Sequence, residues 1–192
     1  MRRLVFAIFI LLCFFSASAE SLLDSFEKSL TALGAYKVCF TVNLDNSYTL
    51  AGEYVVEGAN FYVRLGNTEL YVTDGVKYDV ATDRREVVVD SAQSLGGDIL
   101  SNPASAFARL KEQYNVSQSV VDGRATARLE SKDGAQSAVV VADSSGKLPE
   151  SIVYSQSESF VKITFTSIAA SSESVPRFDR SKYAQYELVD MR

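Results

Sequence analysis

The sequence contains no histidine, no tryptophan and only two cysteines, of which Cys39 alone lies outside the first 19 residues. Without histidine the chain can form no Ser-His-Asp triad, no Cys-His pair and no histidine-ligated metal site. It also has no glycine-rich phosphate-binding loop. We therefore expect no enzyme activity, no cofactor and no metal. Because one cysteine cannot form a disulfide within a chain, the fold must depend on its hydrophobic core.

Residues 1–19 have the pattern of a secretory signal peptide. Two arginines are followed by an apolar run of about a dozen residues, shorter than the roughly 20 that span a bilayer, and then by small residues that end at Ala19. We expect cleavage after Ala19 and export to the periplasm. Residues 20–192 are then predicted to form a single soluble domain, monomeric in solution.

The chain that remains after this cleavage is acidic. It retains 17 basic and 24 acidic residues, a net charge of −7, because Arg2 and Arg3 belong to the leader. An excess of negative charge disfavours binding to the phosphate backbone, so nucleic acid is not an expected partner.

Two segments have the apolar spacing of helices. The first covers 21–33, where Ser21 and Asp24 fit a capping box and Gly34 ends the helix. The second is predicted from Asn102-Pro103 to Tyr114, because asparagine caps a helix well and proline suits its first turn. Ordinary core packing explains either helix, and a lid over a ligand is the alternative.

The rest of the chain alternates apolar and polar residues between short turns, which is typical of β-strands. About eleven strands are predicted, and the final segment, 186–192, is expected to be an edge strand. A strand over 36–44 places Cys39 away from its apolar side. The stretch 48–90 is predicted to be a ladder with a polar face and one apolar face that carries Leu50, Tyr54, Val56, Phe61, Val63, Leu65, Leu70, Val72, Tyr78, Val87 and Val89.

Something must cover this apolar face. A helix is about 10 Å across and covers about two strands, so two helices cannot cover about eleven strands laid flat. The strands either form a two-sheet sandwich or curl around the helices. One helix precedes all the strands and the other lies midway, so we expect a mainly β fold, a curved antiparallel sheet that forms an incomplete, unclosed β-barrel with a helical lid.

The chain resembles the LolA family of periplasmic lipoprotein carriers over essentially its whole length after the leader. The hairpin ELYVTDGVKYDV and the helix that begins at Asn102-Pro103 are the most specific parts of this resemblance. The other matching segments are YKVCFTVNL, Gly52-Glu53-Tyr54, Gly146-Lys147-Leu148-Pro149, VKITFTSI, Phe178-Asp179 and YELVDMR.

The resemblance implies that an apolar cavity binds acyl chains of lipoproteins, which an inner-membrane release machinery supplies and an outer-membrane acceptor receives. Burial of acyl chains is non-directional and needs an apolar lining rather than a catalytic set. The candidate cavity residues are Val38, Phe40, Val42, Leu50, Tyr54, Val56, Phe61, Val63, Leu65, Leu70, Val72, Val161, Ile163 and Phe165. The candidate lid residues are Leu95, Ile99, Leu100, Phe107 and Leu110.

The sequence departs from the family at one position. In the family, an arginine just after the strand that matches GEYVVEG holds the lid shut by hydrogen bonds, and Gly58 occupies that place here. The nearest arginine, Arg64, falls on a different strand. A differently held lid, or a different lipid, would accommodate this change.

Two further functions fit the same sequence. The half-barrel would serve as a protein-binding module of a sensor or an assembly factor if its own side chains fill the cavity. An enzyme that uses two carboxylates would need them about 5 to 10 Å apart in a cleft. A cavity of several hundred Å³ between the sheet and the helices is the feature that favours a carrier.

Overall fold

The computed structural model describes residues 21–94, 106–156 and 159–192. These residues form one 12-stranded sheet in the order β12-β6-β5-β4-β3-β2-β1-β11-β10-β9-β8-β7. Because β12 and β7 end the sheet without pairing with each other, the predicted fold class, an unclosed curved sheet, is confirmed. The strands are β1 (Ala35–Leu44), β2 (Tyr48–Glu57), β3 (Asn60–Leu65), β4 (Thr68–Thr73), β5 (Val76–Ala81), β6 (Glu86–Ser91), β7 (Tyr114–Val121), β8 (Arg124–Ser131), β9 (Gln136–Ala142), β10 (Pro149–Gln156), β11 (Ser159–Ala170) and β12 (Glu187–Asp190).

Most neighbouring strands also follow one another in the sequence, because tight turns join them. The main exception is β1, which pairs with β11 so that Val42 lies opposite Ile163. This pairing joins the two halves of the sheet into one surface. Every pair is antiparallel except β12 with β6, where Glu187 lies beside Glu86 in a parallel register. The expected edge strand is thus confirmed, and its parallel pairing is the exception in the antiparallel sheet, because a long connection brings the C-terminus back along β6.

Both helices have identifiable ends. Helix α1 (Leu22–Leu33) begins at Ser21, whose side-chain oxygen accepts a hydrogen bond from the backbone N–H of Asp24 at 3.1 Å, and it ends at Gly34 with φ 70°. This confirms the predicted caps. Helix α2 (Ala106–Gln113) ends one residue earlier than predicted, because Tyr114 already pairs with β8 as the first residue of β7. The predicted start of this helix lies outside the described residues.

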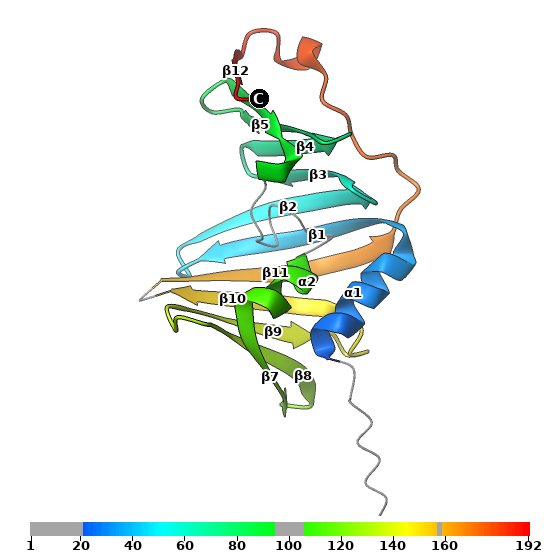
Figure 1. Cartoon of the computed structure of the whole chain (residues 1–192), viewed down its shortest axis with the longest axis vertical. Helices are drawn as coiled ribbons and strands as arrows, with labels where there is room; N and C mark the ends of the chain where they lie inside the picture. The colour runs from blue at the N-terminus through cyan, green and yellow to red at the C-terminus, as the bar shows by residue number, and fades with distance from the viewer. Residues whose placement is uncertain (1–20, 95–105, 157–158) are drawn as a thin grey trace, which may run out of the picture.

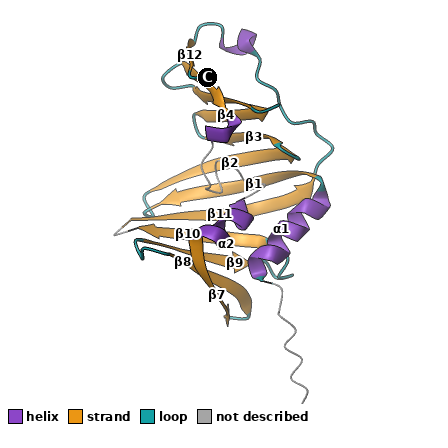
Figure 2. Ribbon diagram, in the orientation of Figure 1, coloured by secondary structure: helices purple, strands orange, loops and turns teal. Residues whose placement is uncertain are grey.

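Both helices lie on the same face of the sheet, in front of its central strands (Figure 1; Figure 2). We call this the inner face. The buried aliphatic and aromatic residues of β1–β4 and β8–β11 form one core there with Phe26 of α1 and Phe107 of α2. Gly52 makes room for this core, since a Cβ atom at that position would lie 2.3 Å from the Phe40 ring, which stacks on Tyr54 at a centroid distance of 4.7 Å.

The apolar side of the predicted ladder changes face part-way along the sheet. Tyr78 pairs with Tyr71 and Val89 pairs with Tyr78, so both lie on the outer face, together with Val87. Their predicted position beside Phe61 was therefore wrong. The inner face of β5 and β6 is polar instead, with Lys77 3.5 Å from Asp90.

The outer face of β3–β6 has a cover of its own. Residues 171–186, which we call the C-terminal strap, pack Val175, Phe178, Tyr183 and Tyr186 against it. The strap contains the 3-10 helix η2 (Arg180–Tyr183) and runs along the sheet to β12 (Figure 1). The strap is not among the elements predicted from the sequence, although Phe178, Tyr183 and Tyr186 are spaced aromatic residues that could have indicated it.

The connection after β6 is described only in part. Ala92–Ser94 form the short 3-10 helix η1. Residues 95–105, which follow it, lie outside the described residues.

Candidate functional site

Most of the predicted cavity residues do come together, on the inner face. Val38, Phe40, Val42, Tyr54, Val56, Phe61, Val63, Val72 and Ile163 are buried in the inner core, and Leu65, Leu70, Val161 and Phe165 are half-buried against it. Leu50 is half-buried, and its side chain lies over Gly66. The shared surface is confirmed, while ligand contact by these residues stays a prediction.

The helical cover contains two of the five predicted lid residues among the described positions. Phe107 and Leu110 are both 3% exposed, and Phe107 meets Phe26 of α1 edge-on with ring centroids 5.4 Å apart. Leu95, Ile99 and Leu100 lie outside the described residues.

An ion pair also joins the two helices at their surface. The Lys111 ammonium group of α2 donates a hydrogen bond to Asp24 of α1 and lies 3.5 Å from Glu27. The hydrogen bond from Lys111, assisted by one from Ser21, holds the pKa of Asp24 below its ordinary value. These groups are substantially exposed, so the pair orients the helices more than it stabilises them.

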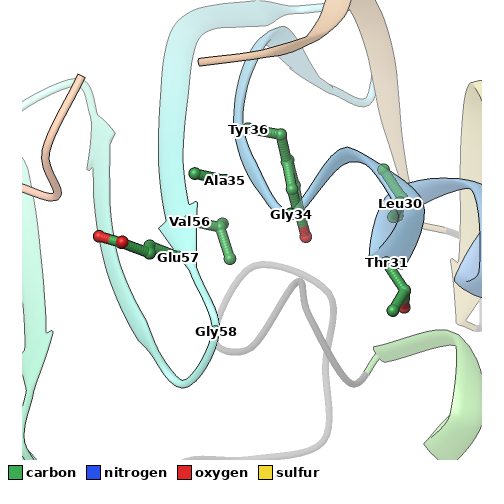
Figure 3. A pocket seen from close by; sticks show the side chains of 8 residues that line it. All are labelled: Leu30, Thr31, Gly34, Ala35, Tyr36, Val56, Glu57 and Gly58. Carbon is green, nitrogen blue, oxygen red and sulfur yellow. The ribbon is translucent and has the colours of Figure 1, made fainter. Parts of the chain in front are cut away.

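A cleft of about 510 Å³ opens at one end of this cover. It lies where the end of α1 turns into β1 and faces the β2–β3 hairpin (Figure 3). This volume is in the range of about 300–1,000 Å³ that is typical of small-molecule sites. The described residues that line it are Leu30, Thr31, Gly34, Ala35, Tyr36, Val56, Glu57 and Gly58.

The cleft adjoins a small apolar hollow inside the core. The two share Leu30 and Tyr36, and the hollow extends from there to Phe107 and Phe165. Its volume of about 20 Å³ is enough for about one water molecule. The described hollow beneath the helices is therefore small, and the larger space of the cleft lies at the edge of the core.

Tyr36 is the polar group that sequence reasoning missed. It belongs to the strand predicted over 36–44 but is not among the candidate cavity residues. It is 3% exposed, and burial raises the pKa of its hydroxyl to about 12. The cleft beside Tyr36 exists because α1 and the β2–β3 hairpin meet there in space. A local sequence pattern does not contain the relative positions of these two elements.

The position that carries an arginine in the LolA family lies at this cleft. Gly58 lines it with φ 59°, in the left-handed region that favours glycine, and a Cβ atom there would meet nothing within 4 Å. Arg64 does not substitute for that arginine, because it pairs with Glu53 at 3.0 Å on the outer face. Lys111 of α2 is one cation that ties the helices together, through Asp24 and Glu27 of α1.

An open hollow of about 430 Å³ lies on the outer face beside Cys39, Glu53 and Arg64, and a polar cluster fastens the strap to the same face. The Glu69 carboxylate accepts hydrogen bonds there from Tyr71, from Tyr183 at 2.8 Å and from Lys182 at 3.1 Å. Burial raises the pKa of Glu69, but these hydrogen bonds outweigh it and hold the pKa below its ordinary value. The cluster fastens the strap to the sheet.

The described residues offer neither a metal-binding cluster nor a membrane-spanning helix. They contain no cluster of three or more histidine, cysteine, aspartate or glutamate side chains arranged to hold a metal ion. None of the helices formed by residues 21–94, 106–156 and 159–192 is long and apolar enough to cross a bilayer. Cys39 is a half-buried free thiol, which the strand register places on the outer side of β1, as predicted.

No known family model matches this chain, and no curated protein matches it in sequence. Among solved structures, an uncharacterized conserved protein from Thermus thermophilus is similar with a TM-score of 0.55 and 10% identity, over 90% of this chain and 99% of its own. This similarity shows that the fold recurs in another protein over nearly the full length of both chains.

Two further structures are more distant. LprF from Mycobacterium bovis has a TM-score of 0.45 at 14% identity, over 84% of this chain and 97% of its own. The Mycobacterium tuberculosis lipoprotein LppX has a TM-score of 0.39 at 12% identity, over 81% of this chain and 98% of its own.

Proposed function

We propose that this chain binds the acyl chains of lipoproteins in the periplasm and carries them toward the outer membrane. The observation that carries the proposal is the cleft of about 510 Å³, which leads from solvent to an apolar face covered by only two helices among the described residues. Removing an acyl chain from water contributes roughly 0.8 kcal/mol per CH₂ group, so such a surface is sufficient to hold it. The described lining of the cleft is largely apolar, which suits the binding of an acyl chain better than it suits catalysis.

Access to the rest of the inner face requires the helices to move. The hollow next to the cleft holds only about 20 Å³, so a long chain must displace α1 or α2 from the core. Aliphatic and aromatic contacts hold this cover together with the ion pairs of Lys111, and apolar contacts can reform around a guest chain. The helices would then act as the lid that the LolA resemblance implies.

The resemblance and the leader supply the remainder of the proposal. The predicted leader indicates export to the periplasm. The LolA-type carriers that this chain resembles receive their cargo from an inner-membrane release machinery and deliver it to an outer-membrane acceptor. A carrier needs no catalytic group, which agrees with the composition of the chain.

A transfer assay tests this function. The purified protein is incubated with vesicles that contain a triacylated lipopeptide, separated from them, and examined by native mass spectrometry before it meets acceptor vesicles. We expect one lipopeptide per protein and its delivery to the acceptor. No bound acyl species after purification or incubation would contradict the proposal.

A matched pair of variants links the assay to the cleft. Thr31 and Ala32 are adjacent exposed residues of α1, but only Thr31 lines the cleft. We expect Thr31→Trp to reduce uptake by filling the cleft, and Ala32→Trp to leave it unchanged. Equal uptake by the two variants would place the acyl chain elsewhere.

One observation favours a second function, a protein-binding module of a sensor or an assembly factor. The described hollow beneath the helices holds only about 20 Å³, as expected of a module that holds no guest. A protein that takes up no lipopeptide but captures an envelope protein through its inner face would support this function instead.

A further inference from the structure

Tyr36 has a buried hydroxyl with an unused hydrogen-bonding capacity. The residue is 3% exposed, and its hydroxyl has no hydrogen-bond partner among the described residues. Buried polar groups in folded proteins nearly always have a partner, because burial removes the hydrogen bonds that water would make. An unpartnered hydroxyl at the edge of a cavity therefore points to a ligand group that completes it.

The hydroxyl lies where the cleft meets the apolar core. Tyr36 lines both the cleft and the adjoining hollow, and Leu30 is the other residue common to the two. Figure 3 shows the ring extending from β1 into the cleft, with its oxygen between Leu30 and Val56. A ligand that enters from the cleft would pass this oxygen before its apolar part reaches the core.

The surrounding chemistry selects the kind of group that the hydroxyl meets. Leu30, Ala35 and Val56 make much of the described lining apolar, and Glu57 is the only charged residue in that lining. In Figure 3 the Glu57 side chain points away from Tyr36, so its carboxylate does not accept a hydrogen bond from the Tyr36 hydroxyl. Its negative charge near the mouth disfavours an anionic head group relative to a neutral one.

The protonation state of Tyr36 defines its role. Burial raises the pKa of the hydroxyl to about 12, so the group keeps its proton at neutral pH. A protonated phenol donates a hydrogen bond to a carbonyl oxygen.

We propose that the Tyr36 hydroxyl donates a hydrogen bond to the neutral ester or amide carbonyl of an acyl chain, while the hydrocarbon beyond it packs against Leu30 and Val56. This assignment rests on the proposed acyl-binding function and adds a recognition element to it. It distinguishes an acyl chain, which has a carbonyl at its head, from a plain hydrocarbon.

Competition between two ligands tests the assignment. Methyl palmitate and hexadecane, delivered from cyclodextrin, displace the fluorescent probe N-phenylnaphthylamine from the wild-type protein, Tyr36→Phe and the exposed control Tyr48→Phe. We expect Tyr36→Phe to bind methyl palmitate about 3- to 10-fold more weakly, the range for one neutral hydrogen bond. Hexadecane binding should not change in this variant, and Tyr48→Phe should bind both ligands like the wild type.

A spectroscopic measurement on the wild-type protein does not depend on the variant. The infrared stretch of an isotope-labelled methyl palmitate carbonyl should move to lower frequency on binding, as expected for a hydrogen-bonded ester. The shift should disappear in Tyr36→Phe, whose thermal midpoint should equal or exceed that of the wild type, because the substitution removes an unpartnered polar group.

The outcomes separate this assignment from the function on which it rests. Failure of both ligands to bind the wild-type protein would overturn acyl binding itself. Binding of both ligands with no selective loss of methyl palmitate in Tyr36→Phe, or with no carbonyl shift, would overturn the Tyr36 assignment alone. An equal loss of affinity for both ligands in Tyr36→Phe would also overturn the assignment, because that result would show that Tyr36 acts through packing and not through a hydrogen bond.

Discussion

The sheet has two covers, and they are held in different ways. On the outer face, stacked aromatic rings fix the strap: the ring centroid of Phe178 lies 4.2 Å from that of Tyr78 and 5.5 Å from that of Tyr183. Tyrosine hydroxyl groups that donate hydrogen bonds to Glu69 also hold it. On the inner face, the helices are held by apolar contacts and a surface ion pair, and a cleft remains beside them. Directional bonds fix one arrangement, whereas apolar contacts tolerate several. The proposed function therefore assigns the admission of a guest to the inner cover.

Removing the central ring of the strap should have the largest effect. Tyr183 is 2% exposed and contacts three other aromatic rings, so Tyr183→Ala loses a large buried side chain and its hydrogen bonds. We expect the free energy of unfolding to fall by about 3–5 kcal/mol, measured by urea denaturation. The exposed control Tyr48→Ala should change it by less than about 0.5 kcal/mol. If Tyr183→Ala altered acyl affinity in the folded protein, the two covers would not be independent.

The corresponding change in the inner cover should affect binding as well as stability. Phe107→Ala removes the ring that packs on Phe26, which should cost about 3 kcal/mol, at the low end for such changes because a short helix can shift toward the gap. The enlarged space should also speed association of the acyl ligand, measured by stopped-flow fluorescence. Unchanged association would indicate that α2 does not control access.

The strap should also respond to pH. The pKa of Glu69 is lower in the folded protein than its ordinary value of 4.5. The ionised carboxylate therefore contributes fully to the free energy of unfolding above pH 4.5, and this contribution is lost as the pH falls through the folded pKa. Glu69→Gln should lower the free energy of unfolding by about 1–3 kcal/mol at pH 7. The difference between wild type and variant in urea midpoint should shrink below pH 4.5. A difference that stays constant down to about pH 2 would show that the charge of Glu69 is unimportant.

The smallest effect is expected for the exposed ion pair of the helices. Lys111→Met should change the free energy of unfolding by only about 0.2–1 kcal/mol, because water screens the pair with Asp24. It should nevertheless speed ligand association, since it releases the described charge pair that joins the helices. Arg64→Met, which breaks a pair on the outer face, is the matched control and should leave association unchanged. Equal rates in the two variants would remove Lys111 from the lid mechanism.

The fold class was predictable because its signals are local. Alternation along 36–44 identified β1, and Ser21 and Gly34 marked both ends of α1. The inward residues from Val38 to Val72 could be chosen in the same way. Tyr78, Val87 and Val89 were placed on the wrong face, because alternation gives the sides of one strand but does not relate them to the sides of the next.

The amino-acid sequence alone was enough to predict a curved sheet with two amphipathic helices and the residues that face inward in most of its strands. It also shows that the chain has no histidine. Composition and periodicity suffice for these, since they depend on near neighbours in the chain. Tertiary structure alone decided that the strap covers the outer face and that the cleft lies beside Tyr36. The strap depends on contacts such as the hydrogen bond between Tyr183 and Glu69, which are separated by 114 residues. The cleft depends on how α1 and the β2–β3 hairpin meet in space, and no local pattern encodes either arrangement.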